Sequence, residues 1–159
     1  MSAWRTNRAA EGAVIVFAGW ASTGLVHAWE HSPYDRFGWL AFLFWLAPVP
    51  WILCRRPGRV AGQGWPSWLG LTLAMIGMVG DLNALGYAGL ACAVAGLLPG
   101  SARILPWLIL SISWMPALGW LARTLPVPAV AGLRLVSGMV AVVLLARGGA
   151  TKVVAERSP

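Results

Sequence analysis

Two apolar runs separated by a proline turn occupy residues 104–146. The runs are Ile104–Leu121 and Val127–Ala146, and Pro126 and Pro128 mark the turn between them. Each run approaches the ~20 residues that a helix needs to cross a bilayer, and backbone groups inside lipid must be bonded within their own segment. The stretch therefore predicts two transmembrane helices joined by a turn. Arg134 is a charge inside the second run, where lipid disfavours it.

Four more apolar runs precede this pair, and none shows the period-2 alternation of a barrel strand. They are Ala13–Trp29, Phe37–Cys54, Trp65–Gly80 and Leu82–Leu98. We therefore predict an all-α, polytopic transmembrane helical bundle of about six spans. The predicted domains are a cytoplasmic start over 1–12, a single transmembrane helical domain over 13–146 and a cytoplasmic tail over 147–159, which we expect to be frayed.

A proline kink and a very short connection modify the predicted spans. Pro48 and Pro50 predict a kink near the end of the second run. The third and fourth runs have almost no loop between them, which favours a hairpin with a polar hinge at Asp81 and Asn83 on the outer surface. The alternative is one long helix followed by a re-entrant piece.

The composition agrees with a lipid-covered exterior. Hydrophobic residues make up 58% of the chain and charged residues 11%, against about 25% charged in soluble domains. The net charge of +7 comes from bases in short clusters between apolar runs, and no soluble segment is long enough to form a basic face, so we exclude nucleic acid as a partner. The lipid bilayer is the predicted partner, other membrane protein subunits are candidates, and no cofactor is predicted.

The distribution of bases predicts the orientation. Six spans place both termini on one side, and basic residues in bacterial membrane proteins concentrate on the cytoplasmic side. The opposite side receives Arg36 and Arg123. The terminal side receives nine of the twelve basic residues, namely Arg5, Arg8, Arg55, Arg56, Arg59, Arg103, Arg147, Lys152 and Arg157. We expect a multi-pass protein of the bacterial cytoplasmic (inner) membrane with cytoplasmic termini.

The segment His27-Ala28-Trp29-Glu30-His31 matches the H-x-x-E-H pattern of inverted zinc proteases. On a helix, His27 and His31 would share one face with Glu30 beside them. A zinc site needs another ligand, and the later acids lack a suitable context. We therefore favour an interfacial turn and predict no metal site.

Arg134 has two interpretations. As a buried element it would pair with Asp81, the acid that we place in the same outer half, and the pair would face a substrate path. Alternatively, Arg134 snorkels to the outer headgroups, about two turns away. The short distance to the surface slightly favours snorkelling.

Cys92 and Cys54 lie in or beside apolar runs, with no zinc spacing and no base or cation near Cys92 in sequence. Apolar packing is the favoured role for both. The pairs Gly89/Ala93, Ala91/Ala95 and Gly96/Gly100 give the fourth run small residues four apart, which predicts close helix packing. Pro116 predicts a kink in the fifth run.

Several stretches resemble the exosortase/archaeosortase family of membrane transpeptidases. They are Tyr34-Asp35-Arg36-Phe37-Gly38 with the later Arg55-Arg56, Trp65-Pro66-Ser67-Trp68-Leu69-Gly70, Pro106-Trp107-Leu108-Ile109-Leu110 with Met115-Pro116, Leu125-Pro126-Val127-Pro128, and Leu133-Arg134-Leu135-Val136-Ser137. The resemblance covers most of 34–146 and matches only the amino-terminal, non-catalytic half of the family.

The resemblance implies part of the family's fold but not its Cys/Arg/His catalytic set. A rival alignment places Cys92 on the catalytic cysteine and Arg134 on the catalytic arginine, but it lacks the family's Ser-Gly and has no later histidine. We therefore expect an accessory or structural membrane subunit, or a fragment, without a complete catalytic site. The alternatives are a cysteine transpeptidase that processes the carboxy-terminal sorting signals of exported proteins, with Cys92 as its weak candidate, and a small transporter or channel.

Overall fold

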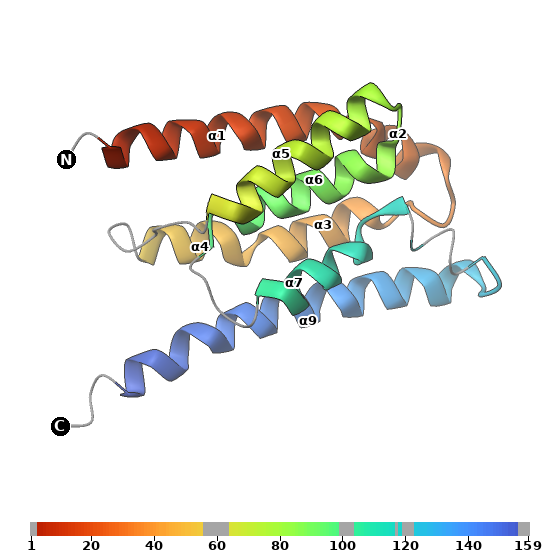
Figure 1. The fold of residues 1–159 in the computed structure, drawn as a ribbon. Coiled ribbons are helices and arrows are strands. Elements are labelled where there is room, and N and C mark those ends of the chain that lie inside the picture. Colours follow the sequence, from red (N-terminus) through yellow and green to blue (C-terminus); the bar gives the residue numbers. More distant parts are fainter. Residues whose placement is uncertain (1–2, 56–63, 99–103, 117, 119–122, 156–159) are drawn as a thin grey trace.

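The computed structural model describes residues 3–55, 64–98, 104–116, 118 and 123–155, and no strand occurs among them (Figure 1). The prediction of an all-α fold is therefore confirmed. The elements are α1 (Ala3–Ala21), α2 (Gly24–His31), α3 (Gly38–Leu46), α4 (Pro48–Arg55), α5 (Gly64–Val79), α6 (Asn83–Ala95), α7 (Ile104–Ile109), the 3₁₀ helix η1 (Leu110–Ser113) and α9 (Val127–Ala155).

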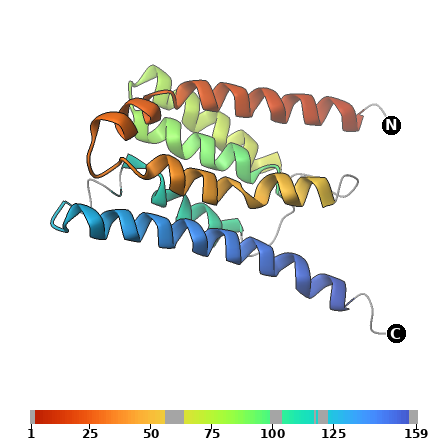
Figure 2. The ribbon, with the colours of Figure 1, turned by 180° about the vertical axis from the view of Figure 1, so that it is seen from behind.

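The long helices lie side by side, with α1 and α9 on opposite flanks and α3, α5 and α6 between them (Figures 1 and 2). Both chain ends lie at one end of the bundle, which we call the terminal end, together with the end of α4 and the starts of α5 and α7 (Figure 1). The α2–α3 connection, the α5–α6 turn and the start of α9 lie at the opposite end, which we call the distal end.

Helix α6 packs against α5 and α1 through backbone-to-backbone contacts. A Cβ added at Gly89 would lie 2.8 Å from the Ala74 nitrogen, and one at Gly70 would lie 2.6 Å from the Ala93 nitrogen. Gly86 approaches α1 in the same way, because its Cβ would lie 2.8 Å from the Ala21 carbonyl oxygen. The predicted close packing of the Gly89/Ala93 face is therefore confirmed. Gly100 lies outside the described residues.

The third and fourth runs form a helical hairpin, so the alternative of one long helix is wrong. Helix α5 ends at Val79 and α6 begins at Asn83. Asp81 has φ = 52°, and Leu82 donates its backbone N–H to the Gly77 carbonyl at 2.8 Å. This bond, from a residue just past the end of α5 back into its last turn, is typical of a Schellman cap with a left-handed residue before the donor.

Prolines break the second and fifth runs. The predicted kink near Pro48 is a break at Ala47, between α3 and α4. In the fifth run the change comes before the predicted point, because α7 tightens into η1 ahead of Pro116. Pro116 has no N–H to offer the Ile112 carbonyl, which instead accepts from Met115 at 3.2 Å.

The terminal helices extend past the predicted domain boundaries. Helix α1 begins at Ala3, inside the predicted start over 1–12, and α9 continues to Ala155, well into the tail that we expected to be frayed. The turn predicted over 99–103, residues 56–63 of the basic loop, and residues 117 and 119–121 of the fifth run lie outside the described residues.

Among the described helices, one segment is long and apolar enough to cross a membrane: Val127–Arg147, with 21 residues. A second exists if Ala10–Ala21 and Gly24–His31, which are bent by 41°, form one broken span. The remaining apolar helices have 10–17 residues each. The fold thus contains one clear membrane-capable helix, and the six-span arrangement remains a prediction.

Candidate functional site

Arg134 lies in the second turn of α9, and its side chain is completely buried, with 0% exposure. Helix α9 presents Val130, Arg134, Gly138 and Ala141 inward at spacings of three and four residues. These positions pack against α3 and η1. The guanidinium is thereby carried into the bundle near its distal end.

Two connecting segments supply the partners of the guanidinium. Arg134 Nε–H donates to the Tyr34 carbonyl at 3.1 Å. Its Nη1 donates to the Ser113 carbonyl at 2.7 Å and to the Met115 carbonyl at 3.1 Å. Its Nη2 forms an ion pair with the carboxylate of Asp35, a residue that is 6% exposed. Four of the five guanidinium N–H groups are therefore bonded.

The local structure explains why these carbonyls are free to accept. The last carbonyls of a helix have no partner in their own helix. Ser113 stands at that position, because η1 ends there. The Met115 carbonyl accepts from the Leu118 N–H at 3.2 Å and has a second lone pair for Arg134. The partial negative charge at a helix end also favours a nearby cation. Arg134 therefore completes the end of η1 and fastens it to α9.

The structure corrects the predicted partner and environment of Arg134. Asp81 does not pair with it, because Asp81 is exposed on the α5–α6 turn and the acid bonded to Arg134 is Asp35. Snorkelling is also wrong, since the guanidinium points into the bundle and is shielded there. The buried Arg–Asp element exists, with a different acid.

Sequence reasoning passed over Asp35, although one signal made it a candidate equal to Asp81. The topology predicted from the basic residues puts the 30–36 turn and the first turns of the last span at the same end of the bundle. Asp35 and Arg134 are 99 residues apart in sequence and meet there. Asp81 satisfied the same criterion, and only the helix packing distinguishes the two acids.

An aromatic cluster extends the site into the bundle. Trp45 and Trp107 stack with their ring centroids 4.0 Å apart, and Trp114 packs edge-on against Trp45 at 5.4 Å. Trp29 donates its indole N–H to the Trp114 carbonyl at 3.0 Å. Gly38 permits this approach, because a Cβ there would lie 2.2 Å from Trp29 Nε1. The cluster links α2, α3 and α7 to the segment that receives Arg134.

The two cysteines lie apart from this site. Cys92 is half-buried on α6 and Cys54 is exposed on α4, and neither forms a disulfide. In the described part of the chain, no hydrogen bond or ion pair joins Cys92 to Arg134, whose bonds are to Asp35 and three carbonyls.

The segment with the H-x-x-E-H pattern forms most of α2. His27 and His31 share a face, with ring centroids 3.9 Å apart, and a ring nitrogen of His31 lies 2.9 Å from the His27 carbonyl. Both rings and Glu30 are exposed. Across the described residues, no three or more His, Cys, Asp and Glu side chains are grouped to hold a metal ion.

The site's chemistry is that of a structural anchor. A guanidinium bonded to a carboxylate and three carbonyls is positioned to hold helices in register, and it presents little free donor capacity to a ligand. No protein family, curated protein or solved structure matches this chain.

Proposed function

We propose that this chain is a multi-pass protein of the bacterial inner membrane that acts as an accessory or structural membrane subunit. Its spans are α1–α2, α3–α4, α5, α6, α7–η1 and α9, and both termini are cytoplasmic. The observation that carries this proposal is the inverted polarity of α9.

Between Val127 and Ala146, helix α9 is apolar on its outer face and carries its one charge, Arg134, inside. Its outward residues include Val136, at 59% exposure, and Met139, at 50%. Its inward face contains Arg134, Gly138 and Ala141. Only 28% of the most apolar window of this helix is buried, which is low for the core helix of a soluble protein. Lipid is the solvent that suits this pattern.

Other helices repeat the pattern. Val16 on α1 is 74% exposed, Val79 on α5 is 88% exposed, and Leu105 on α7 is 65% exposed. Water-soluble monomers rarely expose contiguous apolar patches larger than a few hundred Å². Contact with lipid along the flanks of the bundle removes the free-energy cost of exposing these apolar side chains to water.

The arrangement of charges supports cytoplasmic termini. The terminal end of the bundle contains the start of α1, the end of α4 and the end of α9 (Figure 1). Arg5 and Arg8 lie in the first turns of α1, Arg55 ends α4, and Arg147 and Lys152 lie toward the end of α9. Bases concentrated at one end of a bundle mark its cytoplasmic end.

The short helices fit this proposal through local thinning of the bilayer. The 13 residues of α6 extend about 20 Å at 1.5 Å each, against a hydrocarbon thickness of ~30 Å. Exposed indoles at helix ends, such as Trp65 and Trp68 at the start of α5, anchor short segments at the interface. Helix α6 is also enclosed by α1, α5 and α7, so lipid contacts little of its length.

The subunit role rests on the residues around Arg134 and Cys92. The charged site is occupied by structural bonds, and within the described ranges no base forms a hydrogen bond with Cys92. The exosortase-like character belongs to the same proposal and is supported by the sequence stretches that resemble that family. A transport path lined by both Asp81 and Arg134 is disfavoured, because one is exposed on a turn and the other is enclosed.

Labelling of single cysteines tests the topology. In a background with Cys54 and Cys92 replaced by serine and alanine, an impermeant maleimide should label Ser32→Cys and Thr124→Cys in intact spheroplasts. Thr151→Cys should be labelled only after lysis. Labelling of all three positions from one side, or extraction of the protein by carbonate, would refute the six-span proposal.

Purification in mild detergent tests the subunit role. A stable partner that co-purifies in a fixed ratio supports it, whereas a monodisperse lone monomer contradicts it. The transpeptidase alternative is excluded if Cys92→Ala retains full processing of sorting signals in cells.

A further inference from the structure

The two histidines of this chain, His27 and His31, lie against each other on α2. Their ring centroids are 3.9 Å apart, the ring planes are inclined by 30°, and both side chains are exposed. A bond from zinc to an imidazole nitrogen is about 2.0–2.1 Å long, so two nitrogens on one ion lie roughly 3–4 Å apart. The two rings are therefore close enough to bind one ion after a small rotation about their χ2 bonds.

The hydrogen bond of the His31 ring determines which of its nitrogens is free. Nδ1 of His31 lies 2.9 Å from the His27 carbonyl oxygen. A carbonyl oxygen can only accept, so Nδ1 carries the proton, and Nε2 of the neutral ring keeps its lone pair. Histidines that bind metals usually donate the other ring N–H to a carbonyl or carboxylate, which fixes the tautomer and the ring orientation. His31 thus has the supporting bond of a metal ligand already in place.

Helix α2 is anchored to the bundle on the side opposite the histidine pair. Leu25 is 4% exposed, and Trp29 donates its indole N–H to the Trp114 carbonyl at 3.0 Å. Leu25 and Trp29 are more than a quarter turn of the helix away from His27 and His31. The two imidazoles therefore stand on a fixed support, which lowers the cost of ordering them around an ion.

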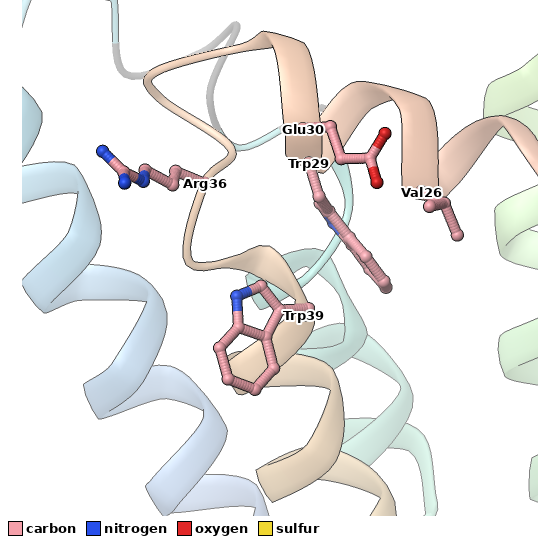
Figure 3. Close-up of a pocket in the computed structure, with 5 residues that line it drawn as sticks. All are labelled: Val26, Trp29, Glu30, Arg36 and Trp39. Carbon is pink, nitrogen blue, oxygen red and sulfur yellow. The ribbon is translucent and has the colours of Figure 1, made fainter.

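An open hollow between α2 and α3 lies beside the pair and does not include it. Its lining residues are Val26, Trp29, Glu30, Arg36 and Trp39 (Figure 3). His27 follows Val26 and His31 follows Glu30 by one position, which is about 100° around the helix. Within the described ranges, no third His, Cys, Asp or Glu is grouped with the two histidines as a metal ligand.

We propose that His27 and His31 form a two-ligand site for a divalent transition-metal ion, with Cu²⁺ bound most tightly. Imidazole suits copper, zinc and nickel, and affinity along the first-row divalent ions is highest for Cu²⁺. Water occupies the remaining positions of the ion, so the site is open and exchangeable, unlike a four-ligand structural zinc site. In the proposed orientation the distal end faces the periplasm, and the site takes its ion from that side.

Calorimetric titration with Cu²⁺, Ni²⁺ and Mg²⁺ tests the site in the full-length protein, purified in detergent without a polyhistidine tag. Cys54 and Cys92 are replaced by serine and alanine, which removes the thiol ligands. The protein should bind one Cu²⁺ more tightly than Ni²⁺ and should not bind Mg²⁺, which prefers oxygen ligands. Loss of a residue that only supports a ligand already costs about ten-fold in affinity or more, so His27→Gln and His31→Gln should each weaken Cu²⁺ binding at least that much.

A rearranged pair provides the matched control. His27→Gln combined with Val26→His keeps two imidazoles on α2 but separates them by five residues, about 140° around the helix. Val26 is 55% exposed, so the new ring is accommodated at the surface. This variant should bind Cu²⁺ as weakly as His27→Gln alone. Asp81→Asn removes an exposed acid at the same end of the bundle and should bind Cu²⁺ like the wild-type protein.

Equal Cu²⁺ affinity of the wild-type protein and the single histidine variants would overturn the proposal, and so would tight binding by the rearranged pair. Circular dichroism checks that each variant keeps its helical content, which is expected because the substituted side chains are exposed. The titration in detergent does not depend on the membrane topology. A protein that binds no Cu²⁺ refutes this site and leaves the proposed function intact.

Discussion

Trp45 and Trp107 each donate an indole N–H to the backbone carbonyl of the other, at 3.1 and 3.3 Å. Their rings stack at an interplanar angle of 12°, and both side chains are fully buried. The pair joins α3 to α7 across 62 residues of sequence. Each residue satisfies its own polar atom while burying a large ring, which is what an indole in a core requires.

Replacement of either indole by phenylalanine should therefore weaken the junction between α3 and α7. Trp45→Phe and Trp107→Phe each remove one hydrogen bond and part of the stacked area, so we expect a loss of about 1–3 kcal/mol of unfolding free energy. Unfolding in mixed micelles at increasing SDS fraction measures this. Trp68→Phe is the control, because Trp68 is 70% exposed, and it should change stability by less than about 0.5 kcal/mol. Equal effects at the three positions would contradict the role of the pair.

Loss of one partner of the Arg134–Asp35 pair should destabilise the protein strongly. Arg134→Gln leaves a buried carboxylate without a counter-charge, and Asp35→Asn leaves a buried guanidinium, so each should cost about 3–5 kcal/mol. The double variant should regain part of this loss, since neither charge then remains uncompensated. The same SDS titration gives the coupling energy. Asp81→Asn is the matched control and should have no effect; a coupling of Arg134 to Asp81 that exceeds its coupling to Asp35 would refute the pairing.

Hydropathy predicted the helices of this bundle well, because burial in lipid or in a core selects the same apolar runs. The runs at 37–54, 65–80 and 82–98 coincide with α3–α4, α5 and α6 to within a few residues. The 3₁₀ segment before Pro116 was missed. The Ser113 and Met115 carbonyls, at and just after its end, bond to Arg134, a contact between distant segments that no local pattern encodes.

The partner of Arg134 could not be predicted from the sequence for a related reason. Topology placed Asp35 and Asp81 at the same end of the bundle, and the choice between them depends on which helix α9 packs against. That packing is set by shape: the inward Gly138 allows α9 to approach α3, since a Cβ there would lie 3.2 Å from the Ala41 carbonyl oxygen. Small residues thus determine which charges meet.

Two buried serines should respond oppositely to the same substitution. Ser22 Oγ–H lies within hydrogen-bonding distance of the Ala18 carbonyl at 2.7 Å and the Gly86 carbonyl at 3.0 Å, whereas Ser113 Oγ has no hydrogen-bond partner among the described residues. Ser22→Ala should therefore cost about 1 kcal/mol, and Ser113→Ala should be neutral or stabilising. Thermal unfolding followed by circular dichroism compares them directly. A larger loss for Ser113→Ala than for Ser22→Ala would contradict this assignment of bonds.

The close contact of α5 with α6 should not tolerate a methyl group at Gly70. An added Cβ would lie 2.6 Å from the Ala93 nitrogen and 2.8 Å from the Gly89 carbonyl oxygen, both rigid backbone atoms. Gly70→Ala should cost about 1–3 kcal/mol through overpacking. Gly132→Ala in α9 is the control, because a Cβ at Gly132 meets no atom within 4 Å, and it should stabilise its helix by up to about 1 kcal/mol. The two glycine-to-alanine substitutions should therefore change the unfolding free energy in opposite directions. Stabilisation by Gly70→Ala would show that α5 and α6 are not in backbone contact.

Replacement of Asp81 by glycine should stabilise the protein. Its φ of 52° is a left-handed conformation that costs a non-glycine residue roughly 1 kcal/mol, and glycine adopts it freely. Asp81→Gly should therefore raise the unfolding free energy by a few tenths to about 1 kcal/mol, offset in part by the greater freedom of glycine in the unfolded chain. Asp81→Val, with a β-branched side chain, should lower it. The SDS titration ranks the three proteins as Gly above Asp above Val. The reverse order would mean that the carboxylate itself, rather than the turn, determines the residue at this position.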